Sequence, residues 1–294
     1  MIIYNKHMKI FLNASEIASM IGKNKFKQPS EVVFRLWQKY FYEDFNDVIQ
    51  GLEKKSIKVV PRETDVETVK RITKETKVDI KKEMGECLKT GNVVDLQKKK
   101  QEIMKKLPKE MPKEKKAEFK KSLEGMTNTN FGTRNENSIL EKYIVKTKRP
   151  ATTCDHFFKK KLISVDFEDE VVDWYILGKV DALVLDKNNP AETTIIEIKN
   201  RIYKFFYHLR EYEKIQTYCY MFLLGHKNAQ LVEALKNKDS DINIIDVKFV
   251  DDYWGKLKSE MEGFITFFLR EFMSNRDVRE SIIMNEEEFN EKYF

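Results

Sequence analysis

The sequence of 294 residues has few cysteines, few glycines and no long apolar run. Its three cysteines, Cys87, Cys154 and Cys219, are far apart and form no CxxC pair. Their odd number argues against a disulfide framework, and three cysteines cannot by themselves hold a four-cysteine iron–sulfur cluster. The ten glycines include no GxxxxGK[ST] phosphate loop, so an ATP-driven motor is not expected. Because no run of about 18 apolar residues occurs, no membrane span is expected either. These absences favour an intracellular protein in a reducing compartment.

Aromatic residues are nearly absent from one segment of the chain. Between Gly51 and Gly125 the only aromatic residue is Phe119, although the whole chain has 20 Phe, 12 Tyr and 3 Trp. The same segment has 22 basic and 14 acidic residues, a net charge of +8, against +6 for the whole chain. A segment of this composition is expected to bury little. Its local positive charge suits a polyanion such as DNA.

The patterns of apolar residues predict a mixed α/β (α+β) core with a charged helical insertion. The expected core domain covers 1–50 and 126–294, and the expected insertion covers 51–125. Within the insertion, helices are predicted at 63–84 and 94–107. Within the core, helices are predicted at 15–21, from 29, and at 136–145, 205–224 and 252–273; strands are predicted at 157–165, 175–185, 193–198 and 242–250.

Three residues of two neighbouring predicted strands form the most informative pattern. Asp181 lies within one apolar strand, and Glu197-Ile198-Lys199 lies in the next, beyond a turn at 188–190. Side chains alternate along a strand, so Glu197 and Lys199 point to one face, and a hairpin would bring Asp181 opposite them. Carboxylates and a backbone carbonyl, here that of Ile198, are the oxygen ligands that Mg²⁺ prefers. The pattern predicts a metal site that hydrolyses phosphodiesters, with the lysine near the attacked phosphate.

Further candidate residues flank this pattern. Glu136 opens a predicted helix and is expected to project towards the same metal. The alternative is a solvated carboxylate that the helix dipole favours in the first turn. Gln216 and Tyr220 lie one turn apart on a later helix and are expected to hold the lysine or a DNA phosphate. A polar helix face without function is the alternative for this pair.

The ordered set Gly132…Glu136, Asp181, Glu197-x-Lys199 and Gln216-x-x-x-Tyr220 resembles the motifs of PD-(D/E)XK exonucleases. In addition, the N-terminal segment 13–26 resembles the opening of the YqaJ-like viral recombinase family, the family of phage lambda exonuclease. The two likenesses cover about residues 10–45 and 126–273, whereas 51–125 matches no known pattern.

This resemblance implies a PD-(D/E)XK fold and a 5′→3′ exonuclease that acts on double-stranded DNA ends in recombination or repair, with Mg²⁺ or Mn²⁺. It implies that Asp181 and Glu197 bind metal, that Lys199 activates water and that Glu136 assists. By the same resemblance, Ser15 would help to hold the 5′-phosphate, and Gln216 and Tyr220 would brace the site.

The resemblance also implies partners: a single-strand annealing protein, and two further copies of the chain in a ring around DNA. A 75-residue insertion at a subunit interface would conflict with that ring. The cytoplasm of a bacterial host, or of a cell infected by a DNA virus, is the expected location. Two alternatives stay open on the motifs alone: a structure-selective or sequence-specific endonuclease, and a DNA-binding protein without catalysis.

Overall fold

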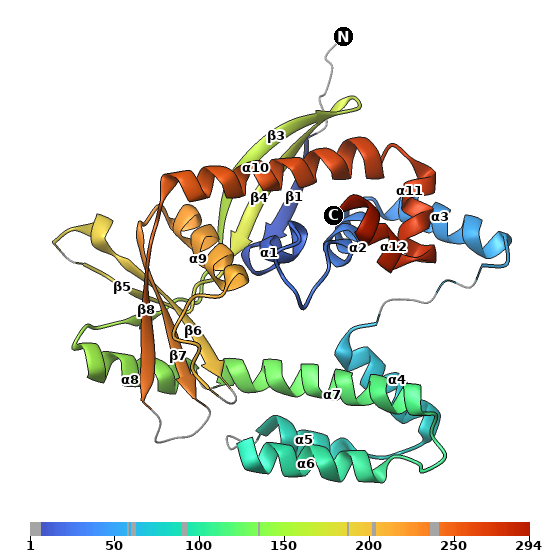
Figure 1. Cartoon of the computed structure of the whole chain (residues 1–294), viewed down its shortest axis with the longest axis horizontal. Helices are drawn as coiled ribbons and strands as arrows, with labels where there is room; N and C mark the ends of the chain where they lie inside the picture. The colour runs from blue at the N-terminus through green and yellow to red at the C-terminus, as the bar shows by residue number, and fades with distance from the viewer. Residues whose placement is uncertain are drawn as a thin grey trace.

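The computed structural model describes residues 7–57, 59, 63–89, 93–134, 136–186, 188–201, 204–235 and 241–294. Two sheets form its centre (Figure 1). The first has the order β1 (His7–Asn13), β4 (Glu170–Gly178), β3 (Phe158–Phe167), with β1 parallel and β3 antiparallel to β4. The second has the order β2 (Thr152–Thr153), β5 (Ala182–Val184), β6 (Thr194–Arg201), β7 (Asn228–Leu235), β8 (Ile242–Lys248), and only β6 and β7 pair in parallel. The predicted mixed α/β class is confirmed.

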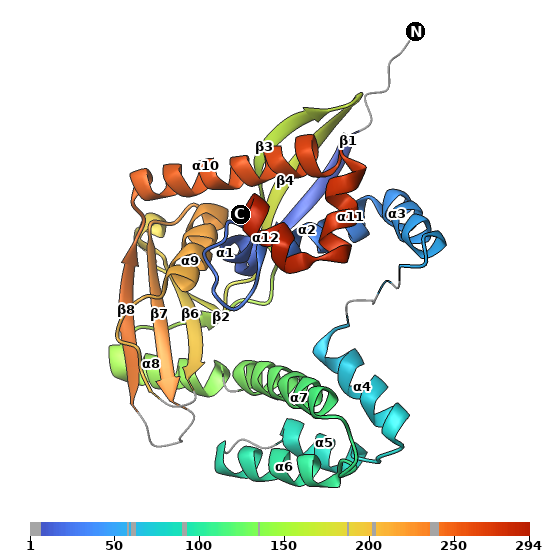
Figure 2. The ribbon, with the colours of Figure 1, turned by 45° about the vertical axis from the view of Figure 1, so that its right-hand side comes forward.

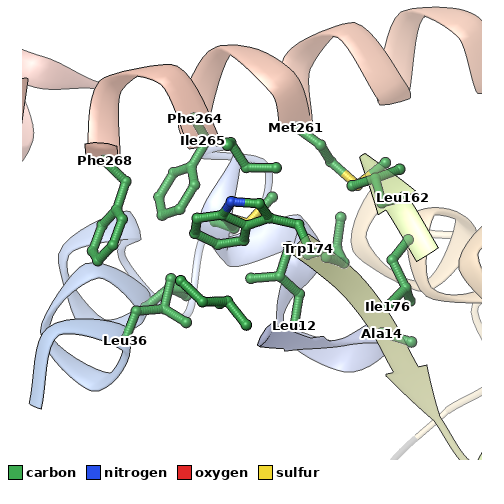
Figure 3. Close-up of a cluster of buried hydrophobic side chains, with 14 of the residues drawn as sticks. Leu12, Ala14, Leu36, Leu162, Trp174, Ile176, Met261, Phe264, Ile265 and Phe268 are labelled. Atoms are coloured by element: carbon green, nitrogen blue, oxygen red, sulfur yellow. The ribbon is translucent and has the colours of Figure 1, made fainter. Parts of the chain in front are cut away.

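A long C-terminal helix covers the three-stranded sheet. It is α10 (Asp251–Phe267), which continues as a π-helical turn over Phe268–Phe272. Apolar residues recur along it at three- and four-residue steps, so they form one stripe that faces the sheet. Figure 3 shows Trp174 of β4 between residues of this stripe and Leu36 of α2 (Pro29–Tyr40). The Trp174 indole is fully buried and lies edge-on to Phe268, with 5.8 Å between ring centroids.

Two helices sandwich the five-stranded sheet. On one face, Ile139, Leu140 and Tyr143 of α8 (Glu136–Thr147) pack against a cluster that includes Ile198. The other face carries α9 (Glu211–Leu224), which also packs against β4 and α1 (Ile17–Met20). Because α9 touches both sheets, it fixes the place where the chain crosses from one sheet to the other.

Two predicted elements have different bounds in the structure. The strand predicted at 175–185 is two strands, β4 and β5, which belong to different sheets and are joined by a bend that contains Asp181. Val180 and Ala182 are both fully buried, so the apolar pattern of the sequence continues through the bend and does not reveal it. The helix predicted at 205–224 begins only at Glu211.

Residues 204–210 are not helical because buried Glu233 binds the backbone N–H groups of Phe206 and Tyr207. The sequence patterns also missed β1, β7 and two C-terminal helices, α11 (Arg276–Met284) and α12 (Glu286–Tyr293). Within the described ranges, no helix is both long and apolar enough to cross a membrane.

The charged segment folds as α4 (Asp65–Thr76), α5 (Lys81–Lys89), α6 (Val93–Lys106) and α7 (Lys113–Arg134), the helical unit below the sheets in Figure 1. The boundaries predicted at residues 50 and 125 fall inside α3 (Tyr42–Lys54) and α7. The helix predicted at 63–84 is broken after α4, where Lys77 has a φ of 55°.

The prediction that this segment buries little is wrong. Ten apolar side chains form a separate core, of which nine are aliphatic or sulfur-containing and the tenth is Phe119. A core can therefore be built here without the aromatic residues on which the prediction relied.

Candidate active site

Strand alternation places Glu197, Lys199 and Arg201 on the face of β6 that α9 covers. Asp181 reaches the same place from the bend between the sheets. Its Oδ2 accepts a hydrogen bond of 2.6 Å from the Ile198 N–H, which fixes the carboxylate beside β6. The structure thus brings together Asp181 and Glu197, as the sequence predicts, but through a bend and not through paired strand positions.

Three carboxyl groups in this region act on one another. Burial, followed by the charge of Glu197, raises the pKa of Asp181 well above its ordinary value. Burial and the same charge raise the pKa of Glu136, the first residue of α8. Glu197 itself is 3% exposed, and its buried Oε2 has no hydrogen-bond partner among the described residues. The site therefore gathers three carboxyl groups that repel one another when charged, a repulsion that a bound cation would relieve.

These residues fit a hard divalent cation. Among the described residues, no three His, Cys, Asp or Glu side chains converge as a preformed metal cage. Mg²⁺, however, is usually held by one or two carboxylates with waters and substrate phosphate. In a strand, the N–H and C=O of one residue point to the same side, so the Ile198 carbonyl lies on the Asp181 side of β6. Asp181, the unpartnered Glu197 oxygen and this carbonyl could together hold the ion.

A chain of hydrogen bonds holds Lys199. Its Nζ donates to Glu197 Oε1 at 2.6 Å and to Gln216 Oε1 at 3.2 Å. The Gln216 amide nitrogen donates in turn to the Tyr220 hydroxyl at 2.8 Å. Burial lowers the pKa of Lys199, but the carboxylates of Glu197, Asp181 and Glu213 together more than offset this, so the pKa lies above its ordinary value. Lys199 is a cation at neutral pH, and the side chains of Gln216 and Tyr220 set its position, as the sequence predicts.

Ser15 lies farther from this group. It is exposed on the short turn η1 (Ala14–Glu16), which packs against α9, and it forms no hydrogen bond with the described residues. The structure gives no contact between Ser15 and Asp181 or Glu197, so its predicted role in holding a 5′-phosphate stays a prediction.

Gly178 is a residue of the site that the sequence patterns missed. A Cβ at this position would lie 2.8 Å from Cε1 of Tyr220 and 3.0 Å from Cδ1 of Leu223. The close approach of β4 to α9 therefore requires glycine, and it seats the Tyr220 ring that holds Gln216. No residue-type motif signals this, because the requirement comes from a neighbour 42 residues away.

We expect Gly178→Ala to displace the Tyr220 ring and loosen the hydrogen bonds to Lys199. Overpacking of this kind costs about 1–3 kcal/mol, and activity should fall further than the loss of folded protein explains. Thermal unfolding and cleavage rates measure the two effects. Gly255→Ala in α10 is the control, because nothing lies within 4 Å of its added Cβ. Wild-type activity in Gly178→Ala would contradict the role of this packing.

A second charged group, also missed, lies next to Lys199 on the same strand. Arg201 donates to Glu213 Oε1 at 2.7 Å and Oε2 at 3.0 Å, and to Glu233 Oε1 at 2.8 Å. Both glutamates are fully buried, and Arg210 also binds Glu213. Although burial opposes it, the bonds from both arginines lower the pKa of Glu213 to about 2. The group ties β6, β7 and the start of α9 together and so fixes the helix that carries Gln216.

We expect Glu213→Gln to destabilise the fold by about 3–5 kcal/mol, because it leaves the two arginines, Arg201 and Arg210, with Glu233 as the one remaining carboxylate of the group. Since the pKa of Glu213 is lowered in the folded state, its stabilising effect is present above about pH 4.3 and is lost as the pH falls towards 2. The gap between variant and wild type in urea unfolding should therefore narrow over that range. Exposed Glu141→Gln in α8 is the control; a gap that does not depend on pH would contradict the pairing.

Comparisons with known proteins give partial likenesses only. No family model and no curated protein matches the sequence. The chain is similar to the crystal structure of an alkaline exonuclease, LHK-Exo, from Laribacter hongkongensis, with 13% identity and a TM-score of 0.37 over 72% of this chain and 92% of that one. The chain is also similar to the crystal structure of LHK-Exo in complex with dAMP, with 13% identity and a TM-score of 0.35 over 63% of this chain and 85% of that one.

A phage-related exonuclease from Haemophilus somnus 129PT gives 14% identity and a TM-score of 0.34 over 48% of this chain and 70% of that one. Likenesses at this level do not assign an activity, which has to come from the chemistry of the site.

Proposed function

We propose that this chain is a metal-dependent DNA nuclease of the PD-(D/E)XK type. The observation that carries the proposal is the buried pair Asp181 and Glu197, two carboxyl groups that share one neighbouring ammonium, that of Lys199, and leave the Glu197 Oε2 without a partner among the described residues. A site with two carboxylates and a fixed lysine suits a reaction in which a metal ion and a phosphate bind next to each other.

In the proposed mechanism, Asp181, Glu197 and the Ile198 carbonyl would hold Mg²⁺ or Mn²⁺. When bound, the ion lowers the pKa of a coordinated water and offsets charge on the phosphate. Lys199, held by Gln216, supplies a second positive charge for the attacked phosphate and orients the water. As a cation it has no lone pair to accept a proton, so we assign it an electrostatic role. Glu136, whose pKa is raised by burial and by the charge of Glu197, would assist from the first turn of α8.

More specifically, we propose a 5′→3′ exonuclease that digests linear double-stranded DNA for recombination or repair. The likeness of the motifs supports this choice, with Ser15 as the contact to the 5′-phosphate. The substrate would be a DNA end, and an annealing protein would receive the single strand that digestion leaves.

The test is digestion of end-labelled linear duplex DNA beside a covalently closed circle, with Mg²⁺ or Mn²⁺ and with a chelator, using Asp181→Ala as the control. Loss of the linear form alone, starting at the 5′ end, supports the exonuclease. Cutting of the circle would replace it by an endonuclease with the same catalytic residues. If neither DNA is cleaved with either metal, the nuclease proposal is wrong and a DNA-binding role remains.

A further inference from the structure

A hollow of about 450 Å³ lies between α6 and α7, in the helical unit and outside the candidate active site. Figures 1 and 2 both show α6 running beneath α7. Its lining combines three cations with amides and an apolar floor: Lys100, Lys105, Lys120, Gln97, Gln101 and Met104. One acidic residue, Glu124, also lines it, so the hollow has a net positive charge.

Lys100 is the unusual residue of this hollow. It is only 6% exposed, yet it forms no ion pair or hydrogen bond with the described residues. Its neighbours in α6 differ, because Lys99 pairs with Glu86 and Lys106 pairs with Glu83, each at 2.5 Å. The covered part of Lys100 is its apolar stem, whereas its ammonium stays accessible from the hollow. An accessible ammonium without a counter-ion among the described residues, with Lys105 and Lys120 beside it, suits an anion.

The acidic residues of the unit do not balance the lysines of the hollow, because several are already engaged elsewhere. Glu63 and Glu118 pair with Arg71, and Glu75 pairs with Lys115. The segment still has an excess of eight positive charges, while the rest of the chain is net negative. The hollow therefore lies in the basic part of the molecule, where the electrostatic attraction for a polyanion is strongest.

The helix that forms one wall of the hollow leads to the candidate active site. Lys120 lies 14 residues before Arg134, where α7 ends, and Glu136 opens α8 two residues later. At 1.5 Å per residue this is about 21 Å. A duplex rises about 3.4 Å per base pair, so a DNA strand cut near Glu136 would pass the hollow about six base pairs away.

We infer that the hollow between α6 and α7 binds a backbone phosphate of the DNA that the active site digests, about six base pairs from the cut. Lys100, Lys105 and Lys120 neutralise the phosphate, Gln97 and Gln101 donate hydrogen bonds, and Met104 contacts the sugar. The inference rests on the proposed nuclease function for the identity of the strand.

The test measures binding of a labelled duplex to the full chain without divalent metal, for wild type, Lys100→Met, Lys120→Met and the control Lys98→Met. Lys98 is exposed on α6 and does not line the hollow. We expect Lys100→Met and Lys120→Met each to weaken binding about tenfold and to reduce the slope of log K against log salt by about 0.9. Lys100→Met should leave the midpoint of thermal unfolding close to that of wild type, because methionine keeps the covered apolar stem.

A series of hairpin duplexes tests the distance. Both variants should lose their effect on stems shorter than about six base pairs. Equal affinities and slopes for Lys98→Met and the two hollow variants would overturn the inference. So would strong binding of dAMP or inorganic phosphate that Lys100→Met abolishes while duplex binding is unchanged, since the hollow would then hold a released product.

Cleavage of the linear duplex with Mg²⁺ by the same proteins separates this inference from the proposed function. If the proteins cleave DNA and the hollow variants bind duplex as tightly as wild type, the phosphate site in the hollow is refuted and the nuclease proposal stands. If those variants bind duplex more weakly and wild type does not cleave, the hollow is a DNA-binding site and the nuclease proposal is refuted.

Discussion

Asp181→Asn is expected to abolish DNA cleavage and, at the same time, to make the metal-free protein more stable. The loss of cleavage should reach about 10³-fold or more, because a metal ligand worth several kcal/mol in the transition state is removed. Asparagine keeps the shape, and its oxygen can still accept from the Ile198 N–H. Stability should rise because the variant no longer buries a carboxylate next to Glu197.

The gain in stability should depend on pH in a defined direction. The pKa of Asp181 is raised in the folded protein, so charging it opposes folding. Below about pH 4, the ordinary value for aspartate, the carboxyl is protonated in both states and the variant gains nothing. As the pH rises from there, the unfolded chain releases the proton first, and wild type loses stability that the asparagine variant retains. Unfolding curves of both proteins at several pH values measure this difference.

Metal should reverse the order of stability. If Asp181 holds the metal, Mg²⁺ should stabilise the folded wild type by mass action and stabilise the variant less. Asp155→Asn is the matched control, because Asp155 is exposed and pairs with Lys179 beside the site. Equal responses of wild type and Asp181→Asn to Mg²⁺ would show that Asp181 does not hold the metal.

The sequence allows the site to be found because its chemistry depends on residue type and spacing. Alternation along one strand is enough to put Glu197 and Lys199 on one face, and one helical turn is enough to align Gln216 with Tyr220. These relations are local. The class of fold follows for the same reason, since α10 and β6 show clear helical and strand patterns.

Other parts of the site depend on neighbours distant in the chain. The bend at Asp181 and the need for glycine at position 178 arise where α9 meets two sheets. Glu233 lies on a strand that the patterns missed, and its bonds to Phe206 and Tyr207 keep the segment before α9 from continuing the helix. The buried Lys100 would also pass for a surface lysine in a charged run, because its burial depends on how α6 packs.

Lys199→Met is expected to lower turnover by about 10²-fold or more while duplex binding changes little. The expected loss is that of one group that stabilises the charge of the transition state. Lys179→Met is the matched control: Lys179 lies in the field of Asp181 and Glu136, but it is bound to exposed Asp155. Single-turnover rates and duplex affinity should be measured with Mg²⁺, because without metal the variant leaves Glu197 unpaired.

The dependence of the rate on pH decides which role Lys199 has. If the lysine took a proton from water, it would have to be neutral, and the rate would rise with pH towards its raised pKa. If the ammonium acts as a cation, the rate falls when it loses its proton at alkaline pH. Lys199→Arg should then retain activity at alkaline pH where wild type has lost it, because a guanidinium stays charged there. A variant with arginine that is as inactive as methionine at every pH would instead assign the proton transfer to Lys199.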